Sequence, residues 1–204
     1  KKSNPTISWE EVPEVLTLME ENPVDASILT QLATKFYFLS GLRVSACVSL
    51  KWEWYDSKDN VWRLPPETRG LKRKKDEGQT HLIPVSSGMK TLMNQLLEIN
   101  GNSEYVFDSP EGKKYPHLNP ETINSYLKKL LGQGRLTAHG WRDVIVTSGQ
   151  EVGKFQRDII LRQIGHTEHK QGASGCYDNT EFLPQRRDLM EWWSKTLIEQ
   201  GLRI

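Results

Sequence analysis

Apolar residues recur at intervals of three and four along most of the chain, which is the period of amphipathic helices. In residues 7–22, Ser8 is followed three positions later by Glu11, a capping-box pattern that precedes an apolar stripe. Gly41 is placed to end a second helix. The same spacing predicts helices at residues 7–22, 26–41, 44–50, 86–99, 119–131, 139–150, 155–165 and 183–200.

Three short runs of β-forming residues interrupt this helical pattern at residues 51–56, 61–65 and 81–85. They predict a small antiparallel sheet. The connection between the second and third runs would form a hairpin loop. It carries a basic cluster that consists of Arg69, Lys72, Arg73, Lys74 and Lys75. We therefore expect a mostly helical α+β domain with a small antiparallel sheet inserted near its N-terminal half.

Composition narrows the class of protein. The 204 residues fit one domain, and 26% charged beside 36% hydrophobic residues is typical of a soluble folded chain. No apolar run approaches the roughly 20 residues of a membrane span, and the first residues lack the apolar core of a signal peptide. Cys47 and Cys176 cannot build a disulfide framework, which suits a reducing compartment. The net charge of +1 neither favours nor excludes nucleic acid.

Several polar residues stand at the predicted ends of elements, and each has a structural alternative. His139 and Arg142 lie three positions apart at a helix start, where both could meet one anion or form a solvated polar face. Arg43 follows a helix-ending glycine and could bind carbonyl groups there. Tyr177 alone is compatible with a buried aromatic residue. His166 with His169 has the spacing of a metal pair, although no third ligand is evident.

The order of these residues resembles the tyrosine recombinase (phage integrase) family. In that family an arginine follows a "GLR" turn, a lysine lies on a β-hairpin, HxxR opens a helix, a histidine or tryptophan follows a "GH" step, and a tyrosine nucleophile comes next. The matching stretches here are "SGLRVSACVSLKW", "AHGWRD", "IGHTEH" and "CYDNTEFLPQRRDLMEWW". The last stretch most resembles integrases of satellite phages and genomic islands.

The resemblance implies six site residues, namely Arg43, Lys72, His139, Arg142, His166 and Tyr177. The chemistry agrees with it, because arginines offer planar donors to the charged oxygens of a phosphodiester transition state. Tyr177 needs a cationic pocket or a base to attack, and the arginines with His139 can supply both. A hairpin lysine can protonate the leaving oxygen. Lys72 fits best by alignment, while Lys74 and Lys75 remain alternatives.

The same resemblance implies a site-specific recombinase that cleaves and rejoins DNA through a 3′-phosphotyrosine, integrating or excising a mobile element without a cofactor or metal. We expect residues 1–7 to be a linker remnant, residues 8–204 the catalytic domain, and the family's N-terminal DNA-binding domain to be absent. The expected partners are double-stranded attachment sites, a homotetramer on paired sites and accessory DNA-bending proteins, in a bacterial cytoplasm with no membrane. The family's usual acidic residue three positions after the first arginine is replaced by Ala46.

Two alternative functions remain at this point. A type IB topoisomerase-like enzyme shares the chemistry but rejoins the original strand, and a noncatalytic DNA-binding regulator would carry a decayed site, for which Ala46 is the one hint. The C-terminal helix also has two interpretations. Its apolar stripe, which contains Leu189, Trp192, Trp193 and Leu197, packs either on its own core or on a neighbouring subunit.

Overall fold

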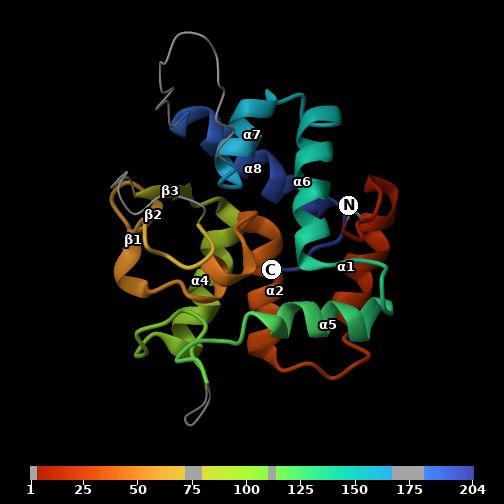
Figure 1. Ribbon diagram of the computed structural model, residues 1–204, viewed down its shortest axis with the longest axis horizontal. Helices are drawn as coiled ribbons and strands as arrows, with labels where there is room; N and C mark the ends of the chain where they lie inside the picture. The colour runs from red at the N-terminus through yellow and green to blue at the C-terminus, as the bar shows by residue number, and fades with distance from the viewer. Residues whose placement is uncertain (1–3, 72–79, 110–113, 167–181) are drawn as a thin grey trace.

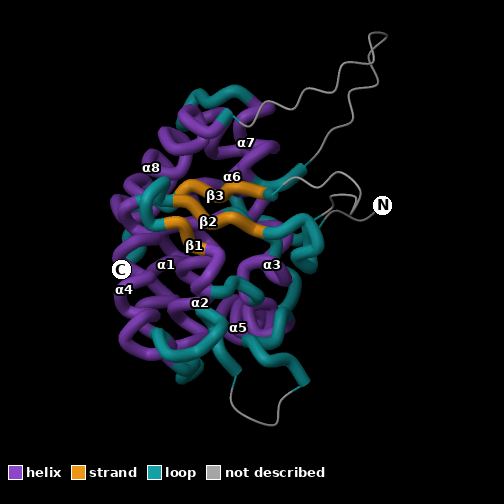
Figure 2. The backbone as a smooth tube through the Cα atoms, turned by 90° about the vertical axis from the view of Figure 1, so that its left-hand side faces the viewer, coloured by secondary structure: helices purple, strands orange, loops and turns teal. Residues whose placement is uncertain are grey.

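The computed structural model describes residues 4–71, 80–109, 114–166 and 182–204. Within them, most of the chain is helical and three short strands form one sheet beside the helices (Figures 1 and 2). The elements are η1 (Trp9–Glu11), α1 (Val12–Glu21), α2 (Ile28–Ser40), α3 (Val44–Val48), η2 (Trp52–Trp54), β1 (Tyr55–Asp56), β2 (Val61–Leu64), β3 (His81–Pro84), α4 (Ser87–Asn100), α5 (Glu121–Leu131), α6 (Ala138–Glu151), α7 (Arg157–Gln163) and α8 (Leu183–Glu199).

The sheet confirms the predicted fold class. Its strands are antiparallel in the order β1-β2-β3, and Trp62 on β2 pairs with Tyr55 on one side and Ile83 on the other. The predicted strand at 51–56 is wrong over its first half, where η2 forms a 3₁₀ turn. The reason is tertiary: the Trp52 backbone N–H donates to the Glu104 carbonyl (3.2 Å), which turns the chain away from the sheet despite its β-forming residues.

The helix ends follow the sequence closely. The Ser8 backbone N–H donates to the Glu11 carboxylate (2.9 Å), although the first turn there is the 3₁₀ helix η1 rather than the α-helix expected from residue 7. Gly41 ends α2 in the left-handed conformation (φ 65°), as its position predicted. The Asn119 side chain accepts the first N–H of α5, from Glu121 (3.0 Å).

Helix α2 is the centre of the core, where it contacts α3, α4, α5 and α8. The Phe38 carbonyl on α2 accepts hydrogen bonds from two indole groups, Nε1 of Trp141 on α6 (3.1 Å) and Nε1 of Trp193 on α8 (2.9 Å). The Trp141 ring also stacks on Phe38, with ring centroids 3.7 Å apart. Three helices that are distant in sequence are thereby fixed to one carbonyl and one aromatic cluster.

The apolar stripe of α8 belongs to this core. Leu189, Trp193 and Leu197 are fully buried, and Trp192 packs on Phe155 with ring centroids 5.5 Å apart. Of the two interpretations of the stripe, the structure therefore favours packing within the domain. Among the described residues, no helix combines the length and the apolar character that crossing a bilayer requires.

Candidate active site

The structure describes four of the six predicted site residues. Arg43 is the N-cap residue of α3, and His139 and Arg142 lie in the first two turns of α6. His166 lies in the turn after α7, following Ile164 and Gly165. The other two, Lys72 and Tyr177, lie outside the described residues, as do the alternatives Lys74, Lys75 and His169.

The start of α6 is fixed by its neighbours before any ligand arrives. The Thr137 hydroxyl accepts the N–H of Gly140 (3.0 Å), which caps the helix. The buried Tyr37 hydroxyl donates to the Ala138 carbonyl, and burial raises the pKa of Tyr37, so it remains a donor. The N-terminal segment also contacts this helix, because the Pro5 carbonyl accepts the Thr137 N–H (3.2 Å). The HxxR turn is therefore held from three sides.

His139 and Arg142 share this helix but differ in environment. Arg142 is only 2% exposed, whereas His139 is exposed, and no hydrogen bond between them is seen in the described chain. The sequence suggested that both groups converge on one anion. In this structure Arg142 lies at the floor of the site and His139 at its surface.

Arg142 is anchored by two carbonyl groups. Its Nε donates to the Gly41 carbonyl (3.1 Å) and its Nη2 to the Ile164 carbonyl. Its Nη1 is buried and meets no acceptor among the described residues. Burial, and then the nearby positive charge of Arg43, lowers the pKa of Arg142 to about 10. A buried cation with an unused donor is prepared to bind an anion.

Arg43 is held in a similar way from the other side. Its Nη1 donates to the carbonyls of Gly70 (2.9 Å) and Gly165 (3.2 Å), and partial burial lowers its pKa. These contacts agree with the alternative that Arg43 binds carbonyl groups near a helix end. They also leave its Nε and Nη2 without an acceptor in the described part of the chain, so the anchoring and the binding of an anion are compatible.

Two glycines that the sequence analysis did not single out supply these carbonyls. Gly165 is left-handed (φ 67°), and a Cβ there would lie 3.6 Å from Nε2 of His81 and 3.7 Å from Nη1 of Arg43. Gly70 is also left-handed (φ 94°). The step "QIGH" after a predicted helix was the available signal for Gly165. His81, fully buried on β3, had no such signal.

A buried hydrogen-bond chain connects α8 to the same region. Arg186 on α8 donates from Nε to Oε1 of Gln163 (3.0 Å) and from Nη2 to the Leu82 carbonyl. Nε2 of Gln163 in turn donates to the Ser40 carbonyl (3.2 Å), one residue before Gly41. The helix that follows residues 167–181 is thus tied to the turn that carries Arg43. Sequence reasoning missed Arg186, because nothing in its local pattern distinguishes a buried arginine.

Ala46, at the position where the resembling family carries an acid, is fully buried in the hydrophobic core. The turn at Gly70 packs directly over it, since a Cβ on Gly70 would lie 3.3 Å from the Ala46 backbone nitrogen. The neighbouring arginines are anchored by carbonyl groups instead of a carboxylate at this position.

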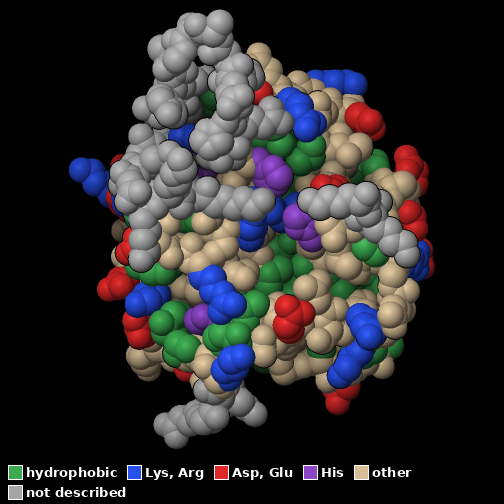
Figure 3. Space-filling view, in the orientation of Figure 1, with side chains coloured by type: hydrophobic (Ala, Val, Ile, Leu, Met, Phe, Trp, Pro, Cys, Tyr) green, Lys and Arg blue, Asp and Glu red, His purple; other side chains and the backbone are tan. Residues whose placement is uncertain are grey.

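The face seen in Figure 3 carries the positive side chains that this arrangement implies. His side chains and some of the Lys and Arg side chains lie near its centre, while other Lys and Arg side chains and most Asp and Glu side chains lie toward the rim. The guanidinium groups of Arg43 and Arg142 lie against the turn after α7, and His166 is the next residue of that turn. The two guanidinium groups can neutralise and orient the nonbridging oxygens of a phosphate ester.

Comparison with known proteins agrees with this arrangement. The model of the phage integrase family matches residues 6–169. The integrase of Enterobacteria phage P4 is 28% identical over 183 residues, which are 83% of this chain and 40% of that protein. Prophage integrase IntA of Escherichia coli K12 is 26% identical over 194 residues, 95% of this chain and 44% of that protein. The chain therefore spans less than half the length of these relatives.

Solved structures show the same fold. The lambda integrase catalytic core superimposes with a TM-score of 0.57 at 16% identity, covering 83% of this chain and 95% of that one. The integrase of mycobacterium phage Brujita gives 0.63 at 17% identity, covering 98% and 64%. A lambda integrase tetramer bound to a Holliday junction gives 0.60 at 15% identity, covering 86% and 51%.

Proposed function

The chain belongs to the phage integrase family, and we propose that it catalyses site-specific DNA recombination by a tyrosine mechanism. One observation carries the proposal: Arg43 and Arg142 bind consecutive carbonyl groups at the end of α7, and each keeps donor groups for a ligand. This pair can hold the two nonbridging oxygens of one phosphodiester, whose transition state gathers negative charge on them.

In the proposed reaction the Tyr177 hydroxyl loses its proton and attacks the scissile phosphorus. A 3′-phosphotyrosyl bond forms while the bond from phosphorus to the 5′-oxygen breaks. The 5′-hydroxyl of a partner strand then attacks the phosphotyrosine and releases Tyr177. Each step exchanges one phosphoester for another, so the bond energy is conserved and no ATP is consumed.

The remaining residues serve the proton transfers. His139 lies exposed at the start of α6, where it can accept the Tyr177 proton. His166 follows Gly165 directly and can donate to the phosphate beside Arg43. Lys72, or else Lys74 or Lys75, protonates the departing 5′-oxygen. We assign no cofactor or metal to these steps.

The partners follow from the reaction. Strand exchange needs two duplexes and more than one active site, and lambda integrase forms a tetramer on a Holliday junction and a dimer on a COC′ core site. We propose that this protein likewise acts on paired attachment sites as a homotetramer, with accessory DNA-bending proteins, in the cytoplasm of a bacterial host. Integration or excision of a mobile element is then its biological role.

A nicked duplex that traps the covalent intermediate tests the proposal. The unaltered protein should form a covalent adduct, and Tyr177→Phe should abolish it while duplex binding stays nearly the same, because phosphate contacts dominate that binding. Undiminished adduct in the phenylalanine variant contradicts the assignment of the nucleophile. Suppression of adduct formation by EDTA contradicts the metal-free mechanism and favours a metal ion bound by His166 and His169.

The same substrate separates the alternatives. A noncatalytic regulator binds the duplex without forming any adduct, and this outcome overturns the enzymatic proposal. A topoisomerase-like enzyme forms the adduct but returns the original strand. Exchange of labelled strands between two duplexes therefore distinguishes recombination from nicking and closing.

A further inference from the structure

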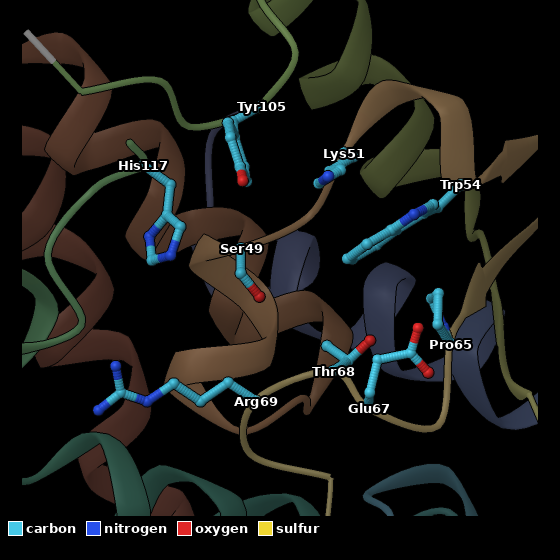
Figure 4. Close-up of a pocket in the computed structure, with 9 residues that line it drawn as sticks. All are labelled: Ser49, Lys51, Trp54, Pro65, Glu67, Thr68, Arg69, Tyr105 and His117. Atoms are coloured by element: carbon cyan, nitrogen blue, oxygen red, sulfur yellow. The ribbon is translucent and has the colours of Figure 1, made fainter. Parts of the chain in front are cut away.

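A cavity of about 200 Å³ lies beside the candidate active site, and Lys51 and Arg69 are among its lining residues (Figure 4). Its polar and aromatic lining includes Ser49, Lys51, Thr68, Arg69, Tyr105 and His117. It adjoins the active site through the chain itself, since Arg69 precedes Gly70, whose carbonyl binds Arg43. A ligand that reaches from Arg43 to the cavity meets cationic side chains at both positions, so repeated anionic groups suit it.

One wall of this cavity contains Tyr105 and His117, and the series of packed rings continues from His117 to Tyr115, which lies outside the cavity lining. The ring centroids of Tyr105 and His117 are 5.4 Å apart. Those of His117 and Tyr115 are 5.6 Å apart, and the angle between these two ring planes is 22°. The buried His117 ring also contacts the Leu118 carbonyl through Nδ1 (2.9 Å). The packed rings place Tyr115 at the edge of the cavity, beside the exposed side chains of Arg69 and Lys114.

Two positive side chains meet at the Tyr115 end of this wall. The Arg69 guanidinium carbon lies 5.6 Å from the Tyr115 ring centre and Lys114 Nζ lies 5.5 Å from it. In the described chain neither cation forms an ion pair with a carboxylate, whereas Lys51 pairs with Glu104 (2.5 Å). A hydrogen bond from Arg69, and next the charge of Lys114, lowers the pKa of Tyr115. Both cations are exposed and have no carboxylate partner within the described chain, so both are available to an anionic ligand.

The floor of the cavity contains an unused hydroxyl. Thr68 is only 6% exposed, and its Oγ1 has no hydrogen-bond partner among the described residues. A tight turn fixes its backbone, because its N–H donates to the Pro65 carbonyl (3.0 Å). A buried hydroxyl without a partner destabilises the folded chain, and a ligand oxygen that accepts from it would remove that cost.

We propose that the backbone of the duplex lies over this cavity, with Arg69 and Lys114 neutralising a second phosphate at its Tyr115 edge and Thr68 donating to the adjacent stretch of backbone. The proposal rests on the proposed function, which supplies the duplex. A phosphodiester fits better than a free phosphate dianion, since Glu67 also lines the cavity and opposes additional negative charge. The subsite would fix the register of the DNA relative to Arg43 without reading its sequence.

Duplex binding measured over a series of salt concentrations tests the subsite. In Arg69→Gln and in Lys114→Gln, a short linear duplex should bind about tenfold more weakly. The slope of log affinity against log salt should become shallower by about 0.9 in each variant. The matched control is Lys90→Gln: Lys90 Nζ also lies over a tyrosine ring, 4.6 Å from Tyr55, but on α4 and outside this cavity. Its slope should not change.

Thr68→Val gives a second, independent readout. It should weaken duplex binding a few-fold while the melting temperature stays the same or rises, because it removes a hydroxyl that has no partner within the described chain. Equal slopes in the parent, Arg69→Gln, Lys114→Gln and Lys90→Gln proteins overturn the subsite, even if the covalent adduct forms normally. If the adduct never forms but the slopes differ as expected, the proposed function fails and the phosphate subsite stands. Loss of self-association with unchanged slopes assigns the cavity to a carboxylate of a second copy and overturns the proposal.

Discussion

Arg43 and Arg142 bind consecutive carbonyl groups of one turn, those of Gly165 and Ile164, at the end of α7. The two guanidinium groups come from elements almost a hundred residues apart, yet this short segment sets the position of both. A displacement at the end of α7 therefore moves both proposed phosphate ligands together, and His166 with them.

Replacing Arg142 with lysine should impair both stability and cleavage. A single ammonium group cannot bond the Gly41 and Ile164 carbonyls in the geometry of a fork, so one buried acceptor loses its partner. We expect Arg142→Lys to lower the free energy of unfolding by about 1–3 kcal/mol and to abolish adduct formation. Arg43→Lys is the control, because the half-buried Arg43 bonds through one nitrogen and should lose less stability. Equal stability losses would contradict the anchoring role of Arg142.

Gly165→Ala tests whether the turn positions the arginines. A left-handed alanine costs about 1–2 kcal/mol, and the added methyl contacts Nη1 of Arg43 and Nε2 of His81. The matched control is Gly134→Ala, which has a similar φ of 83° and no atom within 4 Å of the new methyl. Both variants should melt at similarly reduced temperatures, but only Gly165→Ala should lower the rate of adduct formation. Equal rates in the two variants would show that the turn does not position the site.

Local patterns predicted much of this fold, and the failures share one physical cause. The stop at Gly41, the HxxR helix and the three-stranded sheet follow from short-range periodicity and turn chemistry. The strand predicted at 51–56 failed over its first half, because a contact of Trp52 with Glu104 overrides local propensity.

The sequence proposed the site as a set of side chains and could not give their arrangement. Motif order proposed the two arginines and His166, but the anchors of the arginines are backbone carbonyls, which carry no sequence signature. The sequence also could not predict that Arg142 is buried while His139 is exposed, because helical spacing shows which residues share a face and not how deeply each is buried. Arg186 depends on contacts with Gln163 and Leu82 that only the tertiary structure brings together.

The capping contact at Ser8 predicts a pH-dependent contribution to stability. The hydrogen bond from the Ser8 backbone is the main reason that the pKa of Glu11 lies below its ordinary value of 4.5, and the neighbouring Arg135 lowers this pKa further. A carboxylate whose pKa is lower in the folded state stabilises the fold at pH values above its pKa in the unfolded state. This stabilisation is lost as the pH falls through the pKa of the folded state. Glu11→Gln should therefore melt below the parent at neutral pH and match it in acid. Glu98→Gln, on the exposed face of α4, should follow the parent throughout, and a gap that persists in acid would exclude the ionised carboxylate as the cause.

Lysine variants should identify the acid that protonates the leaving group. Lys72→Ala should slow cleavage by about 10²–10⁴-fold, the usual contribution of a positioned proton donor. A substrate with sulfur at the 5′-bridging position has a leaving group that needs no proton, so it should restore the rate. Lys74→Ala and Lys75→Ala are the controls and should cleave the ordinary substrate normally. Rescue of either control by sulfur, without rescue of Lys72→Ala, would move the acid along the hairpin.

The last prediction concerns α8, whose stripe the sequence left between core and docking surface. Trp193 is 1% exposed and bonds the Phe38 carbonyl, whereas Trp192 is half-buried against Phe155. Trp193→Ala should therefore lower the free energy of unfolding by about 3–5 kcal/mol, and deletion of the residues after Pro184 should leave an unfolded chain. Trp192→Ala is the matched control and should cost clearly less.

Thermal melting of the two tryptophan variants, together with the stoichiometry of the DNA complex, separates stability from assembly. Because Trp193 fills the space between α2 and α6, its loss removes core packing before it affects any neighbouring subunit. A Trp193→Ala protein that melts like the parent but fails to assemble on DNA would contradict this and make α8 a docking element. If Trp192→Ala melts nearly normally and assembles poorly, the half-buried edge of α8 is the part available to a partner, while the Trp193 side remains core.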